Sequence, residues 1–296
     1  MRKFIHKVIR ELIFKYYVHT HKSVTIFNFH QVSQIYDPTV NYRSTWTNIE
    51  EFKRNLNLLK IQYDFIPLTQ ALRILKEGKP KINYAVLTFD DGHACLTDVV
   101  PILEELNIPA TFFINSGYLD DKAYSWVDAL NYISDPEKRS IIPQNLIQYS
   151  KVLRRTTDSL EYNKGREFIE SYFNQLPKNK KRYLTTDELF SIQNPLISIG
   201  LHGYEHQRAS MMSESWNREN IRKDIEILAK HPNYVPVYAI PFGRPDDWNE
   251  DIIKIALENQ LDIMLHNGGY NLHKEVAYNR IAADGLKFEL GLNLFQ

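Results

Sequence analysis

The sequence predicts an α/β protein whose parallel strands form a barrel or a barrel-like sheet. Short apolar runs alternate with amphipathic helical stretches along most of the chain, and most of the apolar runs end in a polar residue. The alternation is interrupted only over residues 118–195, where the pattern is mainly helical. We therefore expect one domain over residues 1–296, with seven or eight strands, right-handed crossovers and a mainly helical insertion at residues 118–195.

The first elements follow from apolar periodicity and helix caps. Residues 24–29 form an apolar run that ends at His30. Thr47 and Glu50 have the spacing of a capping box before an apolar stripe, which predicts a helix over residues 47–60. The next expected elements are an extended piece at residues 65–68, a helix at 69–77, a strand at 85–89, a helix at 99–106 and a strand at 110–115.

The alternation resumes after the insertion. Thr185 or Thr186 is expected to cap a helix, because Asp187 and Glu188 then lie in its first turn. The remaining expected elements are strands at residues 196–201, 235–240, 261–265 and 276–282, and helices at 217–230 and 249–259.

The N-terminal segment predicts an amphipathic helix over residues 2–17. Apolar residues recur there at helical spacing, with Lys and Arg between them, and the segment lacks the continuous apolar region of a signal peptide. Two interpretations stay open, a helix packed on the domain and a helix in peripheral contact with an anionic membrane face. The expected location is the cytoplasm, at the inner face of the membrane if the helix binds there.

The bulk composition excludes other functional classes. The 36 Lys and Arg residues are balanced by 36 Asp and Glu residues, so there is no basic field for nucleic acid. No run approaches the roughly 20 apolar residues of a membrane span. The single cysteine, Cys95, forbids an internal disulfide, which fits a reducing compartment.

Polar residues follow the C-terminal ends of the predicted strands. In a barrel of parallel strands these ends lie on one face, which carries the chemistry. The sequence therefore predicts a cluster on that face that includes His30, Asp90, Asp91, Asn115, His202, Phe242 and His266.

Two motifs in this cluster point to a metal. Asp90 and Asp91 end a buried strand, where adjacent carboxylates repel each other and favour a cation or a proton nearby. The alternative is a polar strand end before a turn. His202 and His206 have a spacing that places both imidazoles on one side of a turn. One carboxylate and two imidazoles suit Zn²⁺, and the second carboxylate is then placed to take a proton from water.

These motifs resemble those of the polysaccharide deacetylases, which are the NodB-homology or carbohydrate esterase family 4 enzymes. Thr-Phe-Asp-Asp-Gly at residues 88–92 and His-x-x-x-His at 202–206 are similar to the first two family motifs. Residues 28–30, 110–114 and 239–243 also resemble the family, and the resemblance covers most of residues 24–282 apart from the insertion. It implies a distorted (β/α)7–8 barrel of the NodB-homology type. It also implies metal-dependent removal of an N-acetyl group from an acetylated amino sugar, or from its polymer, in the biosynthesis of a capsule, exopolysaccharide or O-antigen.

The resemblance implies roles for individual residues. The divalent metal, Zn²⁺ or else Co²⁺, Ni²⁺ or Fe²⁺, would be held by Asp91, His202 and His206. Asp90 would be the general base, and the backbone N–H of Phe242 would bind the oxyanion. Pro241, in the same motif, is predicted to contact the substrate. Trp126, in the insertion, is expected either in the wall of the substrate site or as a structural residue.

The sequence also departs from the family pattern. Many members carry an Arg that orients the base where this chain has Ala239, and we expect Arg280 on the last strand to substitute. Gly203 stands where Ser or Thr is usual. The general acid stays open between two histidines. His30 is similar to the early-strand histidine of a subgroup that acts on exopolysaccharides such as poly-N-acetylglucosamine, whereas His266 follows a late strand.

Three other functions compete with this interpretation. The first is an inactive carbohydrate-binding relative, although both aspartates and both histidines are present. The second is the iron chemistry that also uses two histidines and one carboxylate. The third is deacetylation of a small nucleotide-linked or lipid-linked sugar. The sequence does not predict the oligomeric state.

Overall fold

The computed structural model describes residues 22–285, except residues 38–39, 42–43, 124, 127, 130–143, 154–155 and 175–179. The helix predicted over residues 2–17 lies outside the described residues. Among the described helices, none is long and apolar enough to cross a membrane.

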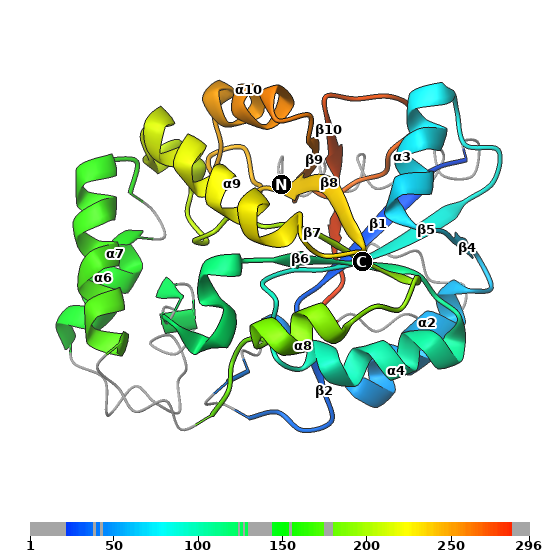
Figure 1. Ribbon diagram of the computed structural model, residues 1–296, viewed down its shortest axis with the longest axis horizontal. Coiled ribbons are helices and arrows are strands. Elements are labelled where there is room, and N and C mark those ends of the chain that lie inside the picture. The colour runs from blue at the N-terminus through cyan, green and yellow to red at the C-terminus, as the bar shows by residue number, and fades with distance from the viewer. Residues whose placement is uncertain are drawn as a thin grey trace, which may run out of the picture.

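A parallel sheet forms the centre of the molecule (Figure 1). Within the described part of the chain its strands follow the order β10-β9-β8-β7-β6-β5-β1-β11, and each neighbouring pair is parallel. A short strand, β4 (Asp64–Phe65), pairs with the start of β5. The main strands are β1 (Val24–Phe29), β5 (Tyr84–Phe89), β6 (Ala110–Ile114), β7 (Ile197–Leu201), β8 (Tyr234–Ala239), β9 (Asp262–Leu265), β10 (Ala277–Asn279) and β11 (Ile281–Ala282).

The sheet closes on itself through the last two strands. β10 pairs with β9, β11 pairs with β1, and only Arg280 separates β10 from β11. The single strand predicted over residues 276–282 is therefore divided in two. Its first half completes the β9 edge, where the Arg280 N–H donates to Leu265 O, and its second half completes the β1 edge, where the Ala283 N–H donates to Asn28 O. This closure confirms the predicted barrel.

Helices cover the outside of the barrel (Figure 1). α3 (Leu68–Glu77), α9 (Glu214–Leu228) and α10 (Glu250–Glu258) lie on one side, and α2 (Ile49–Leu59), α4 (Leu96–Leu106) and α8 (Thr186–Ser191) lie on the other. The strands between them are buried on both faces, so β1, β5 and β6 are almost continuous apolar runs without the alternation of a half-exposed strand.

The helix caps agree with the sequence at one site and differ at another. Thr185 caps α8 in a capping box with Glu188, as predicted. The prediction that Thr47 caps the helix after it was wrong, because Asn48 accepts the Glu50 and Glu51 N–H groups at the start of α2. Thr47 instead lies in β3 (Trp46–Asn48), which pairs with β2 (Gln31–Ser33), and its hydroxyl accepts the Gly285 N–H.

The segment between β6 and β7 contains η1 (Ser116–Asp121), α6 (Gln144–Leu153) and α7 (Ser159–Asn174), followed by α8. α6 and α7 stand together at one end of the molecule, at the left of Figure 1. They share a small apolar cluster that includes Trp126, Tyr162 and Phe173. Met211, at the end of η3 (Ala209–Met211), belongs to the same cluster, and Phe242 packs against it. The insertion is thus packed against loops that follow β7 and β8.

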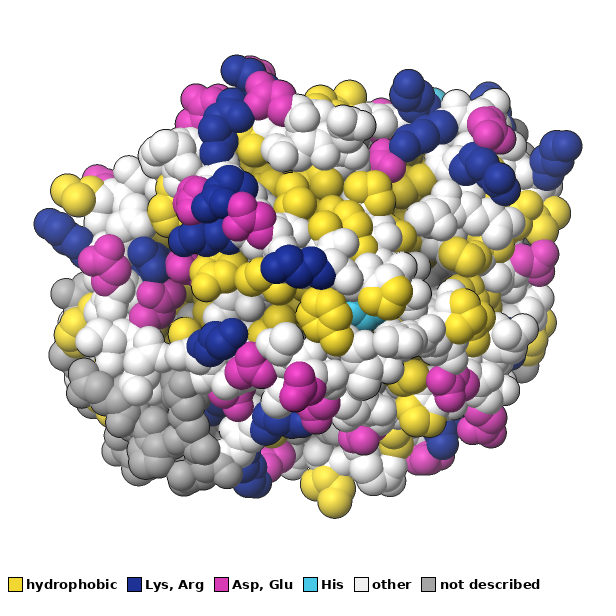
Figure 2. All heavy atoms as spheres, viewed as in Figure 1, with side chains coloured by type: hydrophobic (Ala, Val, Ile, Leu, Met, Phe, Trp, Pro, Cys, Tyr) yellow, Lys and Arg dark blue, Asp and Glu magenta, His cyan; other side chains and the backbone are white. Residues whose placement is uncertain are grey.

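Charges of both signs are interspersed on the face shown in Figure 2. On α9, Arg218 pairs with Glu214 of its own helix and with Glu258 on α10. Arg222 pairs with Glu219 and Glu226. The balanced charge of the sequence is thus arranged on this face as neighbouring pairs rather than as one basic surface.

Candidate active site

The C-terminal ends of the parallel strands bring the predicted cluster together. Asp90 and Asp91 follow β5, His202 follows β7 and His266 follows β9. His30 follows β1, and Asn115 follows β6. Because neighbouring strands are parallel and in register, segments far apart in the sequence meet at this end of the barrel.

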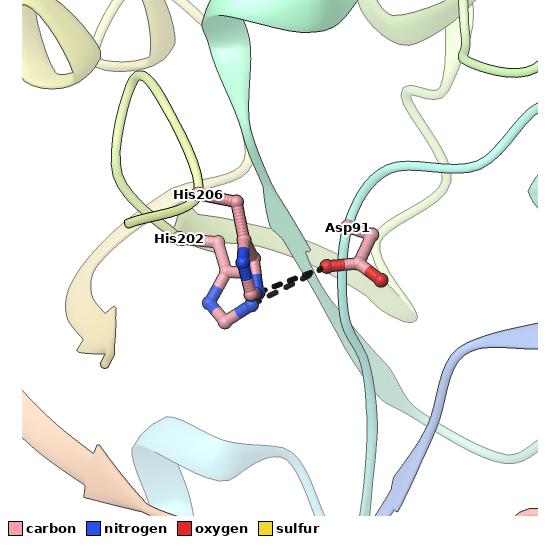
Figure 3. A group of neighbouring side chains, drawn as sticks. All are labelled: Asp91, His202 and His206. Atoms are coloured by element: carbon pink, nitrogen blue, oxygen red, sulfur yellow. Dashed lines mark ion pairs between the residues drawn. The ribbon is translucent and has the colours of Figure 1, made fainter. Parts of the chain in front are cut away.

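Three side chains form a group with metal-ligand geometry (Figure 3). The Nε2 atoms of His202 and His206 each lie 3.5 Å from Oδ1 of Asp91. The dashed lines in Figure 3 show both imidazoles facing this one carboxylate oxygen. The three ligand atoms all lie within 4.8 Å of one another.

This donor set fits a divalent cation. The separation of 3.5 Å is too long for a good hydrogen bond between an imidazole and a carboxylate. Two ligand atoms bound at about 2.1 Å to one tetrahedral ion lie about 3.4 Å apart, which matches the observed separation. Two imidazole nitrogens and one carboxylate oxygen also suit a borderline cation such as Zn²⁺.

His202 has its tautomer set by the neighbouring strand. Its Nδ1 lies 2.7 Å from Ala239 O, which only accepts, so Nδ1 carries the proton and Nε2 keeps its lone pair for a metal. Asn115 holds the loop by donating to the carbonyl oxygens of His202 and Gly203. Gly203 has a φ of +81°, and a Cβ there would lie 2.8 Å from Asn220 Oδ1. This contact explains why glycine replaces the Ser or Thr that is usual in the resembling family.

His206 is held mainly by packing. Its ring lies edge-on to Phe242, with centroids 4.6 Å apart, and the Trp126 indole N–H donates to the His206 carbonyl oxygen at 2.6 Å. The Nδ1 atom of His206 is buried and meets no hydrogen-bond partner among the described residues. Trp126 is only 1% exposed, so the prediction that it lines the substrate site was wrong: a buried ring has no face to offer a sugar. It is a structural residue that supports the backbone of His206.

Asp90 is the most heavily bonded carboxylate of the site. Arg280 donates from Nη1 to Oδ1 at 2.6 Å and from Nη2 to Oδ2 at 2.9 Å, and the Asn28 amide donates to Oδ2 at 2.9 Å. The Thr88 hydroxyl and Arg280 Nη1 both donate to Asn28 Oδ1, which fixes the amide. Burial by itself would raise the pKa of Asp90, but the Arg280 guanidinium and the neighbouring histidines outweigh it and hold the pKa well below its usual range.

His30 is paired with Asp284, which the sequence did not predict as a site residue. The Nδ1 of His30 lies 2.6 Å from Asp284 Oδ2, and the His30 backbone N–H donates to Asp284 Oδ1. Burial by itself would lower the pKa of His30, but Asp284 raises it to about 9. Asp284 follows the last strand in an Ala-Asp-Gly turn, where an aspartate is an ordinary turn residue. No local signal distinguished it.

His266 lies beside His30, with ring centroids 6.5 Å apart. Burial, together with the positive charges of Arg280 and His30, lowers its pKa to about 3. At neutral pH the two candidate acids therefore differ, because His30 is an imidazolium and His266 is a neutral imidazole.

Phe242 sits in a sharp turn after β8. Its φ is 61°, which is rare for a bulky residue, and such conformations are found where the surrounding structure requires them. Its N–H donates to no acceptor in the described part of the chain. Pro241, which precedes it, is buried and accepts the Gly243 N–H at 2.7 Å. Pro241 thus helps to place Phe242, and its own contact with a substrate stays a prediction.

Comparisons with known proteins agree with this architecture. A family model described as polysaccharide deacetylase matches residues 77–264. A search of curated proteins found no match.

Solved structures with a similar fold span nearly the whole chain. IcaB from Ammonifex degensii aligns with a TM-score of 0.61 and 13% identity, over 89% of this chain and 93% of that one. The Streptococcus pyogenes deacetylase PplD, solved in complex with acetate, has a TM-score of 0.59 and 17% identity over 89% and 93% of the two chains. A de-N-acetylase from Aggregatibacter actinomycetemcomitans has a TM-score of 0.58 and 16% identity over 89% and 95%. At these identities the likeness is one of fold.

Proposed function

Because this chain belongs to the polysaccharide deacetylase family, we propose that it is a metal-dependent hydrolase that removes the N-acetyl group from an acetylated amino sugar of a cell-surface polysaccharide. One observation carries the proposal: the group formed by Asp91, His202 and His206 lies beside the buried carboxylate of Asp90. The structural neighbours support it, since one is named a de-N-acetylase and PplD was solved with acetate, the acid that this reaction would release.

Asp91, His202 and His206 would hold the cation, for which Zn²⁺ is our first choice, with Co²⁺, Ni²⁺ and Fe²⁺ as alternatives. When bound, the cation would lower the pKa of a water molecule toward about 7 and would polarise the acetyl carbonyl group.

Asp90 is placed to take the proton from the attacking water. Its Oδ2 lies 3.8 Å from the His202 Nε2 ligand atom, so the carboxylate borders the group of metal ligands. Arg280 and Asn28 keep it ionised and fixed in direction. A carboxylate held so far below its usual pKa has a weak affinity for protons, and so it needs an acidified water as its partner.

Phe242 supplies a donor for the charge that develops during attack. Its backbone N–H takes no internal partner among the described residues, and its ring packs against the metal ligand His206. A backbone donor held in a strained turn needs no reorganisation when the carbonyl oxygen becomes an oxyanion.

His30 is the proposed general acid. As an imidazolium at neutral pH, it can give its Nε2 proton to the departing amine, while Nδ1 stays bonded to Asp284. The products are the free amino sugar and acetate. His266 has no such proton at neutral pH, and this difference favours His30 over its rival.

Acetate release tests the proposal. The metal-loaded protein is incubated with N-acetylated polymers and with nucleotide-linked N-acetyl sugars, with and without chelator, and an Asp91→Asn variant serves as control. We expect release from a polymer that stops with chelator and is restored by Zn²⁺. Release of acetate only from the nucleotide-linked sugars would identify a precursor of the polymer, rather than the polymer itself, as the substrate. No release from any of them, at full metal occupancy, would favour a carbohydrate-binding protein.

A further inference from the structure

His93 lies behind the proposed metal group and has no part in the reaction scheme. We propose that His93 is a positioning residue that holds Asp91 as a single-oxygen metal ligand, and that Tyr183 and Asp128 of the insertion hold His93 in turn. This inference rests on the proposed metal site.

The two oxygens of Asp91 have separate neighbours. Oδ1 faces the Nε2 atoms of His202 and His206, while Oδ2 lies 3.3 Å from the Nε2 of His93. His93 is only 2% exposed, so water does not compete for this contact. A donor on Oδ2 opposes rotation of the carboxylate and opposes bidentate binding, which leaves more of the coordination sphere open for water and substrate.

Asp91 itself sets the tautomer of His93. A carboxylate oxygen only accepts, so the Nε2 of His93 carries the hydrogen that is directed at Asp91 Oδ2. The Gln31 amide nitrogen donates to Val40 O at 2.8 Å and lies 3.3 Å from Nδ1 and 3.4 Å from Nε2 of His93, so Gln31 contacts the ring without selecting a tautomer.

The insertion fixes the plane of the imidazole. The Tyr183 ring stacks on His93 with centroids 5.4 Å apart and an interplanar angle of 12°. The Tyr183 hydroxyl donates to Asp128, and both residues are buried. The Tyr183 ring, near the end of the insertion, therefore holds His93. Asp128, near the beginning of the insertion, holds Tyr183 in turn.

Backbone hydrogen bonds also join the end of the insertion to the loop that follows β5. The Leu184 N–H donates to Gly92 O, and the Ala94 N–H donates to Arg182 O, so residues 182–184 pair with the loop that carries Asp91. Asp91 itself has a φ of 75°, in the left-handed region that is costly for a residue with a Cβ. Pairing with residues from the insertion supports that strained conformation.

Metal affinity, measured by competition with a chromogenic chelator, tests the inference. His93→Phe keeps a ring for Tyr183 to stack on but removes the donor, whereas His93→Gln keeps a nitrogen near the position of Nε2. We expect His93→Phe to bind Zn²⁺ about 10–100-fold more weakly than wild type and His93→Gln to recover most of the affinity. The absorption spectrum of the Co²⁺-loaded protein should also change in His93→Phe, because Asp91 can then bind through both oxygens.

The outcomes separate this inference from the proposed function. If wild type binds no Zn²⁺, both are overturned. If wild type and a folded His93→Phe bind Zn²⁺ equally and give the same Co²⁺ spectrum, only the role of His93 is overturned. If His93→Phe does not fold, His93→Asn takes its place, because its shorter amide keeps a polar group beside Gln31 but does not reach Asp91.

Discussion

Arg280 donates two hydrogen bonds, of 2.6 and 2.9 Å, to Asp90, which lies 190 positions earlier in the sequence. Arg280 is also the residue at which the barrel closes, between β10 and β11. Its guanidinium lies over the Phe113 ring, 5.3 Å from the centroid, and both members of the ion pair are buried. The proposed base therefore takes its orientation from the closure of the sheet, although Ala239 occupies the place of the usual orienting Arg.

Replacing Arg280 should affect stability and the acidic limb of the pH–rate profile. Arg280→Met leaves the Asp90 charge buried without its partner, which should cost about 3–5 kcal/mol of unfolding free energy. The pKa of Asp90 should rise, so activity is lost at a higher pH than in wild type. Arg280→Lys keeps the positive charge but cannot donate the two parallel hydrogen bonds of the guanidinium to Asp90. We therefore expect its stability and its acidic limb to lie between those of wild type and Arg280→Met. Denaturant unfolding and kcat against pH measure these effects, and an unmoved acidic limb would contradict the assignment of Asp90 as base.

The basic limb of the pH–rate profile should report His30. Its pKa of about 9 means that activity falls as the pH rises through that value, because the acid loses its proton. Asp284→Asn removes the charge that raises this pKa, so the basic limb should move by about one pH unit or more toward lower pH. His30→Asn should lower kcat about 10²–10⁴-fold and keep its metal. His266→Asn is the matched control, and a basic limb that moves in this variant instead would reverse the two roles.

The same pair links stability to pH. The folded-state pKa of His30 lies above the unfolded value of 6.5, so its contribution is fully present below pH 6.5 and is lost as the pH rises toward about 9. A shift of this size corresponds to about 3 kcal/mol. In metal-free protein, we expect the unfolding free energy of wild type relative to Asp284→Asn to decrease over this window. Parallel curves for the two proteins would show that the pair is not coupled.

Removing a proposed metal ligand should separate binding from catalysis. His206→Ala should lose bound metal, whereas Asp90→Asn should keep it and lose turnover. A bound ion stabilises the folded state by about 2.7 kcal/mol at 100 times its Kd, so Zn²⁺ should raise the Tm of wild type and Asp90→Asn but not of His206→Ala. Elemental analysis and thermal melts check both statements, and equal metal content in the two variants would exclude the assigned ligand set.

The turn at Phe242 offers a test of the oxyanion donor. A Cβ on Gly243 would lie 2.6 Å from the His266 backbone nitrogen, so Gly243→Ala must shift the turn that aims the Phe242 N–H. We expect a loss of about 1–3 kcal/mol of stability and a lower kcat with little change in metal affinity. Gly268→Ala is the control, since its φ of +71° is similar but nothing lies within 4 Å of the added carbon. Equal kcat values in the two variants would argue against a role for this turn.

The residues at the strand ends show which parts of the site could be predicted from the sequence. Asp90 and Asp91 follow one apolar run, His202 follows another with His206 four residues later, and parallel strands must place such ends on one face. Their proximity was therefore predictable without coordinates. Trp126 was not, because a tryptophan in a helical segment has the same local pattern whether it lines a cleft or fills a core. Asp284 was missed for a similar reason, since its turn is ordinary until His30 is placed beside it.

The order and type of the main elements, and the residues at their ends, follow from the amino-acid pattern without coordinates. Those properties depend on periodicity, caps and glycines within a few positions of each other. The partners of these residues depend on the fold: Arg280 for Asp90, Asp284 for His30, and His93 for the second oxygen of Asp91. Two of these contacts span 190 and 254 positions, and they exist because one strand segment divides between two sheet edges and closes the barrel. Local patterns carry no information about which edges meet.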